Sequence, residues 1–517
     1  MQKTVDVKLN AKPLFLGLYH EYEFEGPCRM GTGPMLTKAY DLANIAEKKK
    51  AGQAAIEKWL ADRVNLLPAF SWNYDEEFRL DDDRLAEAMA DMATVDVYLV
   101  PPISRFTFIL LEIAQKTKKP IILTPPIYLP TAMGTAAALR ARDFEVYAAR
   151  TWKETLDIID VLTVRKALSE TRVLCAARFG TSKTPSAGDN LINPDTATQK
   201  FGVRFRYINS HELLDQTEII DPSSNHTLPG RKALNPTPDD VKEINQMVDE
   251  LIAGATECHM KREEIFHSFR AYYTIYKLLE YYGCNAFCAP CPDLCATRRL
   301  NEERYTFCMN HSLLNEVGIP SACEYDMCAL ISLTILENFS KAGAYMGNAL
   351  HTPFSIAQTG KLFEAAHYNL DGNCNTDYIR KVAEDPENTV FILHAAPNRK
   401  LHGFQAESGS YALRPFTGSG WGVTLRYDFN QDAGTTVTMC RLDPSCRKLF
   451  VAMGEIIAGR GWDDNGCSLG VYVHVKSGSD FFQKQLDFGN HMPLAYGDYK
   501  EKICMLGKIL GLEVVTA

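Results

Sequence analysis

The sequence lacks an excess of basic residues, a long uninterrupted hydrophobic run and an apolar leader. Its 55 Lys and Arg residues are outnumbered by 64 Asp and Glu residues, which gives a formal net charge of −9. Proteins that bind nucleic acid or anionic membranes present a basic face, so this balance argues against both classes. The most apolar stretch, residues 95–114, is interrupted by Pro101, Pro102 and Arg105 and predicts a strand, a loop and a helix rather than a membrane span. Because the first residues also lack the apolar region of a signal peptide, we expect a cytoplasmic protein.

Internal repeats and low-complexity tracts are absent as well, and the overall composition is that of an ordinary globular protein. Apolar residues make up 46% of the chain and charged residues 23%. A chain of 517 residues predicts two to four domains and can build a core without disulfides. The 15 cysteines are therefore expected to be reduced thiols, as in a cytoplasm.

Hydrophobic patterns divide the chain into three predicted domains, at residues 1–168, 169–340 and 341–517. In the first, short apolar runs bounded by proline alternate with helical patterns, which is typical of buried parallel strands. The second repeats this alternation and ends in a long apolar helix over residues 327–339. The third is rich in strands separated by Gly- and Asp-bearing turns, which favours an antiparallel sheet or barrel. The predicted fold class is therefore α/β, with two Rossmann-like α/β domains followed by a β-rich C-terminal domain.

The predicted elements follow from the same patterns. Predicted strands cover residues 13–18, 64–67, 96–100, 120–124, 172–176, 202–208, 390–393, 421–425, 435–439, 470–475 and 512–515. Predicted helices cover residues 37–62, 84–92, 239–256, 264–282, 327–339 and 500–510. A further strand is predicted to end at residues 317–320.

Three polar residues stand out next to these elements. Glu324 lies between the predicted strand end at 317–320 and the apolar helix, Asn348 follows Met346 and Gly347, and His491 lies in a Gly-Asn-His sequence. A carboxylate, an amide oxygen and an imidazole are metal ligands when they converge. Each residue also has an ordinary explanation, because an acid suits the first turn of a helix, Asn suits a left-handed turn and a loop histidine is commonly exposed.

The segments around these residues resemble motifs of the L-fucose/L-arabinose isomerase superfamily, and most closely its fucose isomerase-like branch. The resemblance is carried by residues 318–326 (GIPSACEYD), 346–348 (MGN), 388–397 (NTVFILHAAP) and 489–498 (GNHMPLAYGD). It covers the C-terminal 240 or so residues, whereas the first 300 match only in general architecture. The resemblance implies two Rossmann-like domains before a β-rich domain, a divalent metal, usually manganese, and a homo-oligomer, either a trimer or a hexamer.

The resemblance also implies an activity and a ligand set. Family members interconvert an aldose and a ketose through an enediol, with a metal that acidifies the C–H bond beside the carbonyl and a carboxylate that moves the proton. Glu324 and His491 match the family's metal ligands. Asn348 matches a position at which the well-studied isomerases carry an acid that is both a ligand and the catalytic base.

The exchange of that acid for Asn348 leaves the base unassigned. An amide oxygen can bind a metal but cannot take up a proton. The candidates for proton transfer are Glu324 itself, Asp326, Asp293 and His394. Asp326 could also be a solvated charge in the first turn of the helix, and His394, at the end of an apolar strand, could instead cap that strand through the backbone.

Candidate substrate contacts are Trp421, His20 and Glu21. Trp421 lies in the loop 418–422 (GSGWG), where its ring could stack on a sugar. His20 and Glu21 follow the first predicted strand, and the resemblance implies that this domain contributes to the active site of a neighbouring subunit. For these two residues an ordinary surface loop is the alternative.

Cys284, Cys288 and Cys291 form a C-x3-C-x2-C pattern, followed by Cys295. That spacing occurs in three-thiolate iron–sulfur sites. It also places the thiols on one face of a helix, although Pro290 would break such a helix. A thiol-lined wall that presents Asp293 to the site is the favoured interpretation.

The leading hypothesis is a metal-dependent sugar isomerase, an intramolecular oxidoreductase. A metal-dependent lyase acting on a modified sugar and a sugar-binding protein without turnover are the alternatives.

Overall fold

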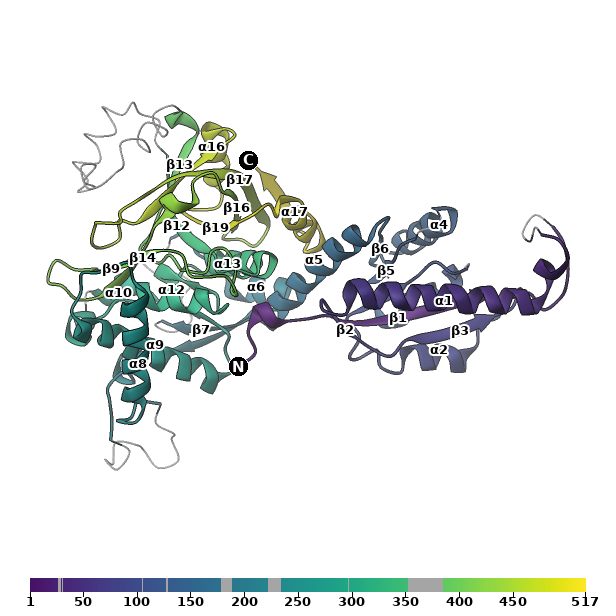
Figure 1. The fold of residues 1–517 in the computed structure, drawn as a ribbon, viewed down its shortest axis with the longest axis horizontal. Helices are drawn as coiled ribbons and strands as arrows, with labels where there is room; N and C mark the ends of the chain where they lie inside the picture. The colour runs from purple at the N-terminus through teal and green to yellow at the C-terminus, as the bar shows by residue number, and fades with distance from the viewer. Residues whose placement is uncertain are drawn as a thin grey trace. The chain divides into compact units, whose positions relative to one another are not determined.

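The computed structural model describes residues 1–517 except 27, 28, 30, 105, 127, 128, 178–187, 222–233, 296 and 352–384. Its described residues form two compact units. One unit is Lys8–Lys166, and the other combines Met1–Val7 with Ala167–Ala517. Figure 1 shows the elements of both units. The predicted domain boundaries near residues 168 and 340 stay predictions.

The N-terminal unit contains one parallel sheet in the order β2-β1-β4-β5-β6, with β3 also pairing with β1. Strands β4 and β5 are buried along their whole length, as expected of parallel strands covered on both faces. The strands are β1 (Asn10–Leu18), β2 (Asn65–Leu66), β3 (Phe70–Tyr74), β4 (Val97–Val100), β5 (Ile121–Leu123) and β6 (Val146–Ala148). The helices are η2 (Gly33–Leu36), α1 (Lys38–Leu60), α2 (Asp82–Met89), α3 (Thr107–Thr117), α4 (Leu129–Arg140) and the start of α5 (Trp152–Glu170).

A second parallel sheet, in the order β11-β10-β7-β8, opens the larger unit. Its strands are β7 (Arg172–Ala176), β8 (Arg204–Ile208), β10 (Ala286–Cys288) and β11 (Ser321–Ala322). The elements around them are η1 (Thr4–Asp6), α6 (Pro194–Phe201), α7 (Ser210–Asp215), α8 (Asp240–Gly254), α9 (Arg262–Tyr282), α10 (Cys291–Cys295), α11 (Arg299–Glu303), α12 (Cys308–Glu316), η3 (Cys323–Tyr325) and α13 (Met327–Ser340). Two parallel sheets in the N-terminal half confirm the predicted class.

The C-terminal part is a closed six-stranded antiparallel barrel in the order β16-β19-β12-β13-β18-β17, with β17 pairing back to β16. The barrel confirms the predicted β-rich domain. Its strands are β12 (Tyr345–His351), β13 (Thr389–Leu393), β16 (Thr436–Leu442), β17 (Lys448–Arg460), β18 (Gly470–Val475) and β19 (His491–Tyr496). The accompanying elements are β9 (Glu257–Cys258), η4 (Pro386–Asn388), β14 (Tyr411–Pro415), β15 (Val423–Tyr427), η5 (Phe429–Asp432), α16 (Gly478–Gln485), α17 (Lys500–Ile509) and β20 (Glu513–Thr516).

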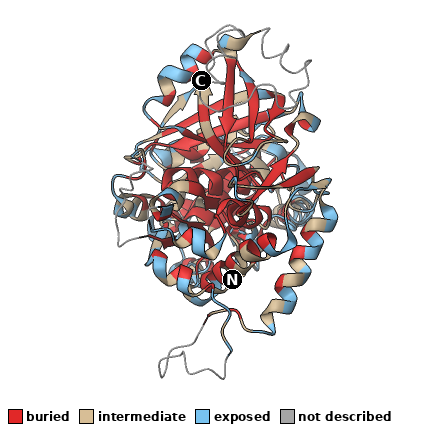
Figure 2. Ribbon diagram, turned by 90° about the vertical axis from the view of Figure 1, so that its left-hand side faces the viewer, coloured by how far each residue is buried: buried red, intermediate tan, exposed pale blue. Residues whose placement is uncertain are grey.

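Helix α13 joins the second parallel sheet to the barrel. It follows the turn after β11, packs against β16 and β19, and is buried from Met327 to Phe339. A helix that is apolar on all sides belongs in the interior of a protein. Figure 2 shows the buried residues concentrated in the barrel strands and the helices beside them.

The predicted strand end at residues 317–320 is displaced in the structure. Helix α12 continues to Glu316, and Gly318 has a φ of +72°, a left-handed conformation that ends the helix without steric cost. The strand itself is Ser321–Ala322, so Glu324 follows it after a single residue.

Candidate metal centre

Glu324 is presented by the η3 turn at the carboxyl end of β11, the edge of a parallel sheet at which functional side chains commonly lie. Glu324 and the next residue, Tyr325, have φ values of +55° and +62°. Such left-handed conformations cost a residue other than glycine about 1–2 kcal/mol. Two strained residues in succession persist only where surrounding contacts hold them, and such strain gathers at functional sites.

The barrel brings His394 and His491 to this turn through strand β12. In the barrel β12 lies between β13 and β19, and its residue Asn348 is paired with both Leu393 and His491. His394 directly follows Leu393 at the end of β13, whereas His491 begins β19. Two histidines that are 97 residues apart in the sequence (491 − 394) therefore meet at one rim of the barrel.

The three side chains converge. Nε2 of His394 lies 3.7 Å from Oε1 of Glu324, and Nε2 of His491 lies 3.7 Å from Oε2. One ligand atom from each residue lies within 4.8 Å of the others. Two ligands at about 2.1 Å from a common ion are roughly 3.4–3.6 Å apart, so the spacing fits a metal between them. Glu324, His394 and His491 could therefore hold a metal ion.

The two facing imidazole nitrogens support this conclusion. Both rings are buried, with exposed fractions of 2% for His394 and 1% for His491, yet neither Nε2 atom has a hydrogen-bond partner among the described residues. A separation of 3.7 Å from Glu324 is too long for a hydrogen bond. Leaving a polar atom buried and unpaired costs about 1–3 kcal/mol, which a bound cation would offset.

The ring of His491 is oriented through its Nδ1 atom. Its Nδ1 atom lies 2.9 Å from Oδ2 of Asp326, which also accepts a hydrogen bond from Nη1 of Arg441 at 2.7 Å. Burial alone would raise the pKa of Asp326, but Arg441 and His491 hold it well below its usual range. An ionised carboxylate at Nδ1 keeps the proton there and leaves the lone pair of Nε2 free, as in many histidine ligands.

His394 has a different environment. Its Nδ1 atom accepts a hydrogen bond from the Ala395 N–H at 3.0 Å and lies 3.6 Å from Sγ of Cys467. Burial lowers the pKa of His394, but the neighbouring Cys467 and Cys323 thiols raise it well above its ordinary value. Binding a metal through Nε2 would require any ring proton to be on Nδ1, so Nδ1 would then donate to the Cys467 sulfur and no longer accept the Ala395 N–H.

Glu324 is ionised in this setting. Burial raises the pKa of Glu324, but His394 and His491 lower it by more. The net pKa therefore lies below the ordinary value for Glu. Its side chain is 23% exposed, unlike the two histidines. Glu324 is thus a charged oxygen ligand that also faces the accessible side of the group.

No family model and no curated protein matches this chain. The resemblance described above therefore rests on the motifs, on an architecture of two parallel α/β sheets and a barrel, and on the convergence of Glu324 with His491.

Asn348, the third predicted ligand, is engaged with protein groups. Its Oδ1 atom accepts a hydrogen bond from Nδ2 of Asn490 at 2.6 Å, and its own Nδ2 donates to the Leu393 carbonyl at 3.4 Å. The Asn490 bond occupies one of the two lone pairs of Oδ1. His394 takes the third place in the group instead, and Asn348 stays a predicted ligand.

The two predicted proton carriers Asp326 and Asp293 differ in burial. Asp326 has no exposed surface and caps α13 by accepting the Ala329 N–H at 2.8 Å. The structure excludes the alternative of a solvated first-turn charge, because Arg441 and His491 occupy the buried carboxylate. Asp293 is half-buried on α10, which packs against the turn that carries Glu324.

The predicted substrate contacts stay predictions. Trp421 is half-buried in the hairpin turn between β14 and β15 and packs on the core beneath α12. His20 and Glu21 follow β1 in the N-terminal unit, where Nδ1 of His20 lies 2.9 Å from Asp41 and Glu21 pairs with Lys38 at 2.6 Å.

The cysteine pattern does not form a thiolate cluster. Cys288 is on β10, Cys291 and Cys295 are on α10, and Cys284 precedes β10. Among the described residues, the only His, Cys, Asp and Glu side chains grouped at metal-ligand distance are the three described above. All 13 cysteines in the described ranges are free thiols.

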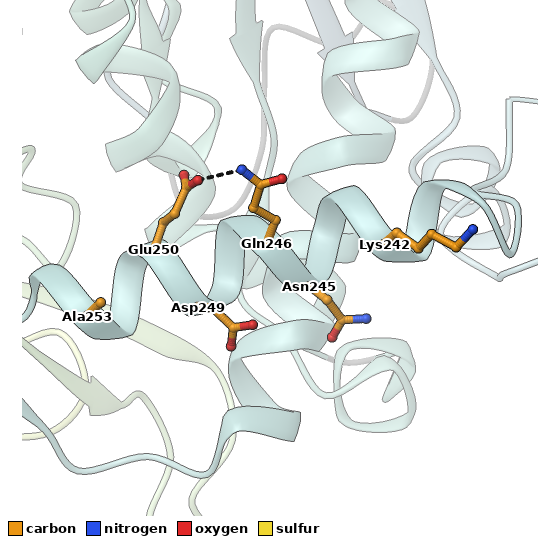
Figure 3. A pocket seen from close by; sticks show the side chains of 6 residues that line it. All are labelled: Lys242, Asn245, Gln246, Asp249, Glu250 and Ala253. Carbon is orange, nitrogen blue, oxygen red and sulfur yellow. Dashed lines mark hydrogen bonds between the residues drawn. The ribbon is translucent and has the colours of Figure 1, made fainter.

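A surface hollow along α8 is unrelated to the metal centre. Figure 3 shows that one helix face lines it, through Lys242, Asn245, Gln246, Asp249, Glu250 and Ala253. None of these is a predicted site residue. Within the described part of the chain, no helix combines the length and the apolar character needed to cross a membrane.

Proposed function

We propose that this protein is a metal-dependent isomerase that interconverts an aldose and a ketose by proton transfer through an enediol. The observation that supports this proposal most is the convergence of the Glu324 carboxylate with two buried, unpartnered imidazole nitrogens. The sequence motifs around Glu324, Asn348, His394 and His491 point to the same chemistry.

Glu324, His394 and His491 would hold a divalent ion, for which we propose Mn²⁺. A divalent cation supplies Lewis acidity, which polarises a carbonyl and acidifies the adjacent C–H bond. Glu324 turns one oxygen towards each histidine, and Asp326 keeps the Nδ1 proton of His491 away from the site. The burial of both rings excludes water from that side of the group.

We assign proton transfer to Glu324, with Asp293 as the second candidate. Asp326 cannot reach a substrate, because it is sealed behind His491 and paired with Arg441. Glu324 is ionised and partly exposed, so it can both contact a ligand and accept a proton.

Deuterium exchange tests this function. With Mn²⁺ present, the wild-type protein should incorporate solvent deuterium at C2 of a pentose or 6-deoxyhexose and should form the matching ketose. Glu324→Gln should reduce exchange by at least ~100-fold, within the range usual for loss of an acid–base group. Glu455→Gln, a change at an exposed position on β17 of the same barrel, is the matched control and should leave exchange unchanged.

The same exchange assay distinguishes the candidate bases and the alternative functions. Exchange by Glu324→Gln at the wild-type rate would refute the assignment, and loss of exchange in Asp293→Asn alone would move the base to Asp293. A cleaved or eliminated product would identify a lyase, whereas stoichiometric sugar binding without exchange would identify a binding protein. His394→Gln with wild-type Mn²⁺ affinity but slow exchange would make His394 a proton carrier rather than a ligand.

We further propose that the protein acts in a reducing cytoplasm as a homo-oligomer, a trimer or a hexamer. The free thiols are consistent with a reducing compartment. Neither nucleic acid nor a membrane is a proposed partner, because the net charge of −9 disfavours both.

A further inference from the structure

The side chain of Asn190 bridges the backbone on both sides of Asp326. Its Nδ2 donates to the Tyr325 carbonyl at 2.7 Å, and its Oδ1 accepts the Met327 N–H at 2.9 Å. Oδ1 also accepts the Leu191 N–H at 2.8 Å. Asn190 is 3% exposed, so these bonds are shielded from water.

The preceding residue, Asp189, holds the segment that leads into His491. Its Oδ2 accepts the Asn490 N–H at 2.8 Å and lies 3.2 Å from Nη2 of Arg441. Arg441 also donates from Nε to the Phe488 carbonyl at 2.5 Å. Gly489 has a φ of +108°, and a Cβ atom there would lie 2.0 Å from Oδ2 of Asp189, so the close approach requires glycine.

The turn that carries Glu324 and the segment that leads into His491 both need these contacts. Glu324 and Tyr325 are in left-handed conformations that residues other than glycine adopt at a cost in free energy. The Asn190 side chain donates to the carbonyl of Tyr325 and so helps to hold this turn. His491 belongs to a different element, the barrel strand β19, and reaches Glu324 only if the turn and the strand keep their mutual position. Two neighbouring residues thus fasten both ligand-bearing segments to each other.

We propose that Asp189 and Asn190 form a positioning clamp for the metal centre, which sets the geometry between Glu324 and His491 without touching the ion. This inference rests on the proposed metal-dependent function. The clamp lies more than 130 residues before either ligand in the sequence, so its effect on metal binding is a property of the fold and not of the ligand motifs.

Mn²⁺ binding by calorimetry, with the visible absorption of the Co²⁺-substituted protein as a second readout, tests the clamp. Asn190→Ala should lower Mn²⁺ affinity by ~10–100-fold, the effect usual for residues that orient metal ligands, and should change the Co²⁺ bands, which depend on coordination geometry. Asn190→Asp keeps the oxygen that accepts from Met327 but sets a second acceptor oxygen against the Tyr325 carbonyl, so its loss of affinity should be at least as large.

Asn285→Ala is the matched control. Asn285 is also buried and also makes three bonds to the backbone: it accepts the Arg172 N–H and donates to the Gln2 and Glu170 carbonyls. It lies at the amino end of β10, whereas Glu324 follows the carboxyl end of the neighbouring parallel strand β11. It should lose thermal stability yet keep Mn²⁺ affinity within about twofold of wild type, well short of the ligand-orienting effect. Wild-type affinity and an unchanged Co²⁺ spectrum in both Asn190 variants would overturn the clamp alone. Failure of the wild-type protein to bind stoichiometric Mn²⁺ would overturn the metal centre, and the clamp's role with it.

Discussion

Asp326→Asn is the most informative single change, because it removes a charge from an ion pair in which neither side chain is exposed. Oδ2 of Asp326 lies 2.7 Å from Nη1 of Arg441, and the exposed fraction of both side chains is 0%. Removing one partner of such a buried pair costs about 3–5 kcal/mol, because the other charge is left uncompensated. Asp189 remains 3.2 Å from Arg441 in the variant, so we expect the lower end, about 3 kcal/mol.

The same change acts on the metal through His491. An amide oxygen can still accept the Nδ1 proton, but without the negative charge it holds that proton less firmly and makes Nε2 a weaker ligand. Loss of a carboxylate behind a histidine ligand typically lowers metal affinity ~10–100-fold. We therefore expect the Mn²⁺ dissociation constant to rise by that factor, about 1.4–2.7 kcal/mol of binding free energy.

Chemical denaturation of the apoprotein and calorimetric Mn²⁺ titration measure the two effects separately. Asp432→Asn is the control, because Asp432 is also buried and accepts hydrogen bonds from Tyr427 at 2.6 Å and Tyr496 at 2.7 Å, with His402 at 2.8 Å. It should lower stability and leave Mn²⁺ affinity unchanged. If Asp326→Asn bound Mn²⁺ as tightly as wild type, its role in orienting His491 would be refuted.

Two buried titratable groups give opposite pH dependences. Burial lowers the pKa of His311 to about 3, so below pH 6.5 the unfolded chain binds a proton that the folded ring does not, and stability should fall by about 1.4 kcal/mol per pH unit between pH 6 and pH 4. His311→Gln should remove that part of the slope in denaturation series, and an unchanged slope would contradict the assignment. Burial raises the pKa of Glu337 well above its usual value, so stability should instead fall as pH rises above 4.5, through ionisation of the unfolded chain. Glu337→Gln should gain stability over wild type progressively from pH 5 to pH 8, and a constant difference would count against this explanation.

Local patterns were sufficient for most of the fold. The helix predicted over residues 84–92 is α2, which begins just after Asp81 because the Asp81 side chain accepts the N–H groups of Asp83 and Arg84. The mainly apolar helix over residues 327–339 is α13, which is buried along this whole range, as expected of a helix with so few charged residues. The short strand β11 was misplaced, because two residues carry too little pattern to be located without their partner β10.

The membership of the site could be predicted only in part. Glu324 and His491 stood out because their neighbours in the sequence resemble motifs of the isomerase superfamily named above. His394 as the third member depends on β12 lying between β13 and β19, which is a pairing over more than a hundred residues. Arg441 and Cys467 carried no local signal, because a lone arginine in a strand and a lone cysteine in a loop gain their roles only from the residues they meet.

The place of His394 in the group also changes the meaning of Asn348. With two acids and one histidine, a ligand set would carry two negative charges and cancel a divalent ion, and it would contain a second carboxylate to act as the base. With Glu324, His394 and His491 the set carries one negative charge, so a bound divalent ion would keep net positive charge and polarise a neutral substrate oxygen more strongly. Asn348 in place of an acid also removes the second carboxylate from the site. Two imidazole ligands shift the metal preference of the site from magnesium towards transition metals. Stronger polarisation would lower the demand on the base, so in the proposed reaction a single partly exposed carboxylate, Glu324, would suffice where the resemblance implies two.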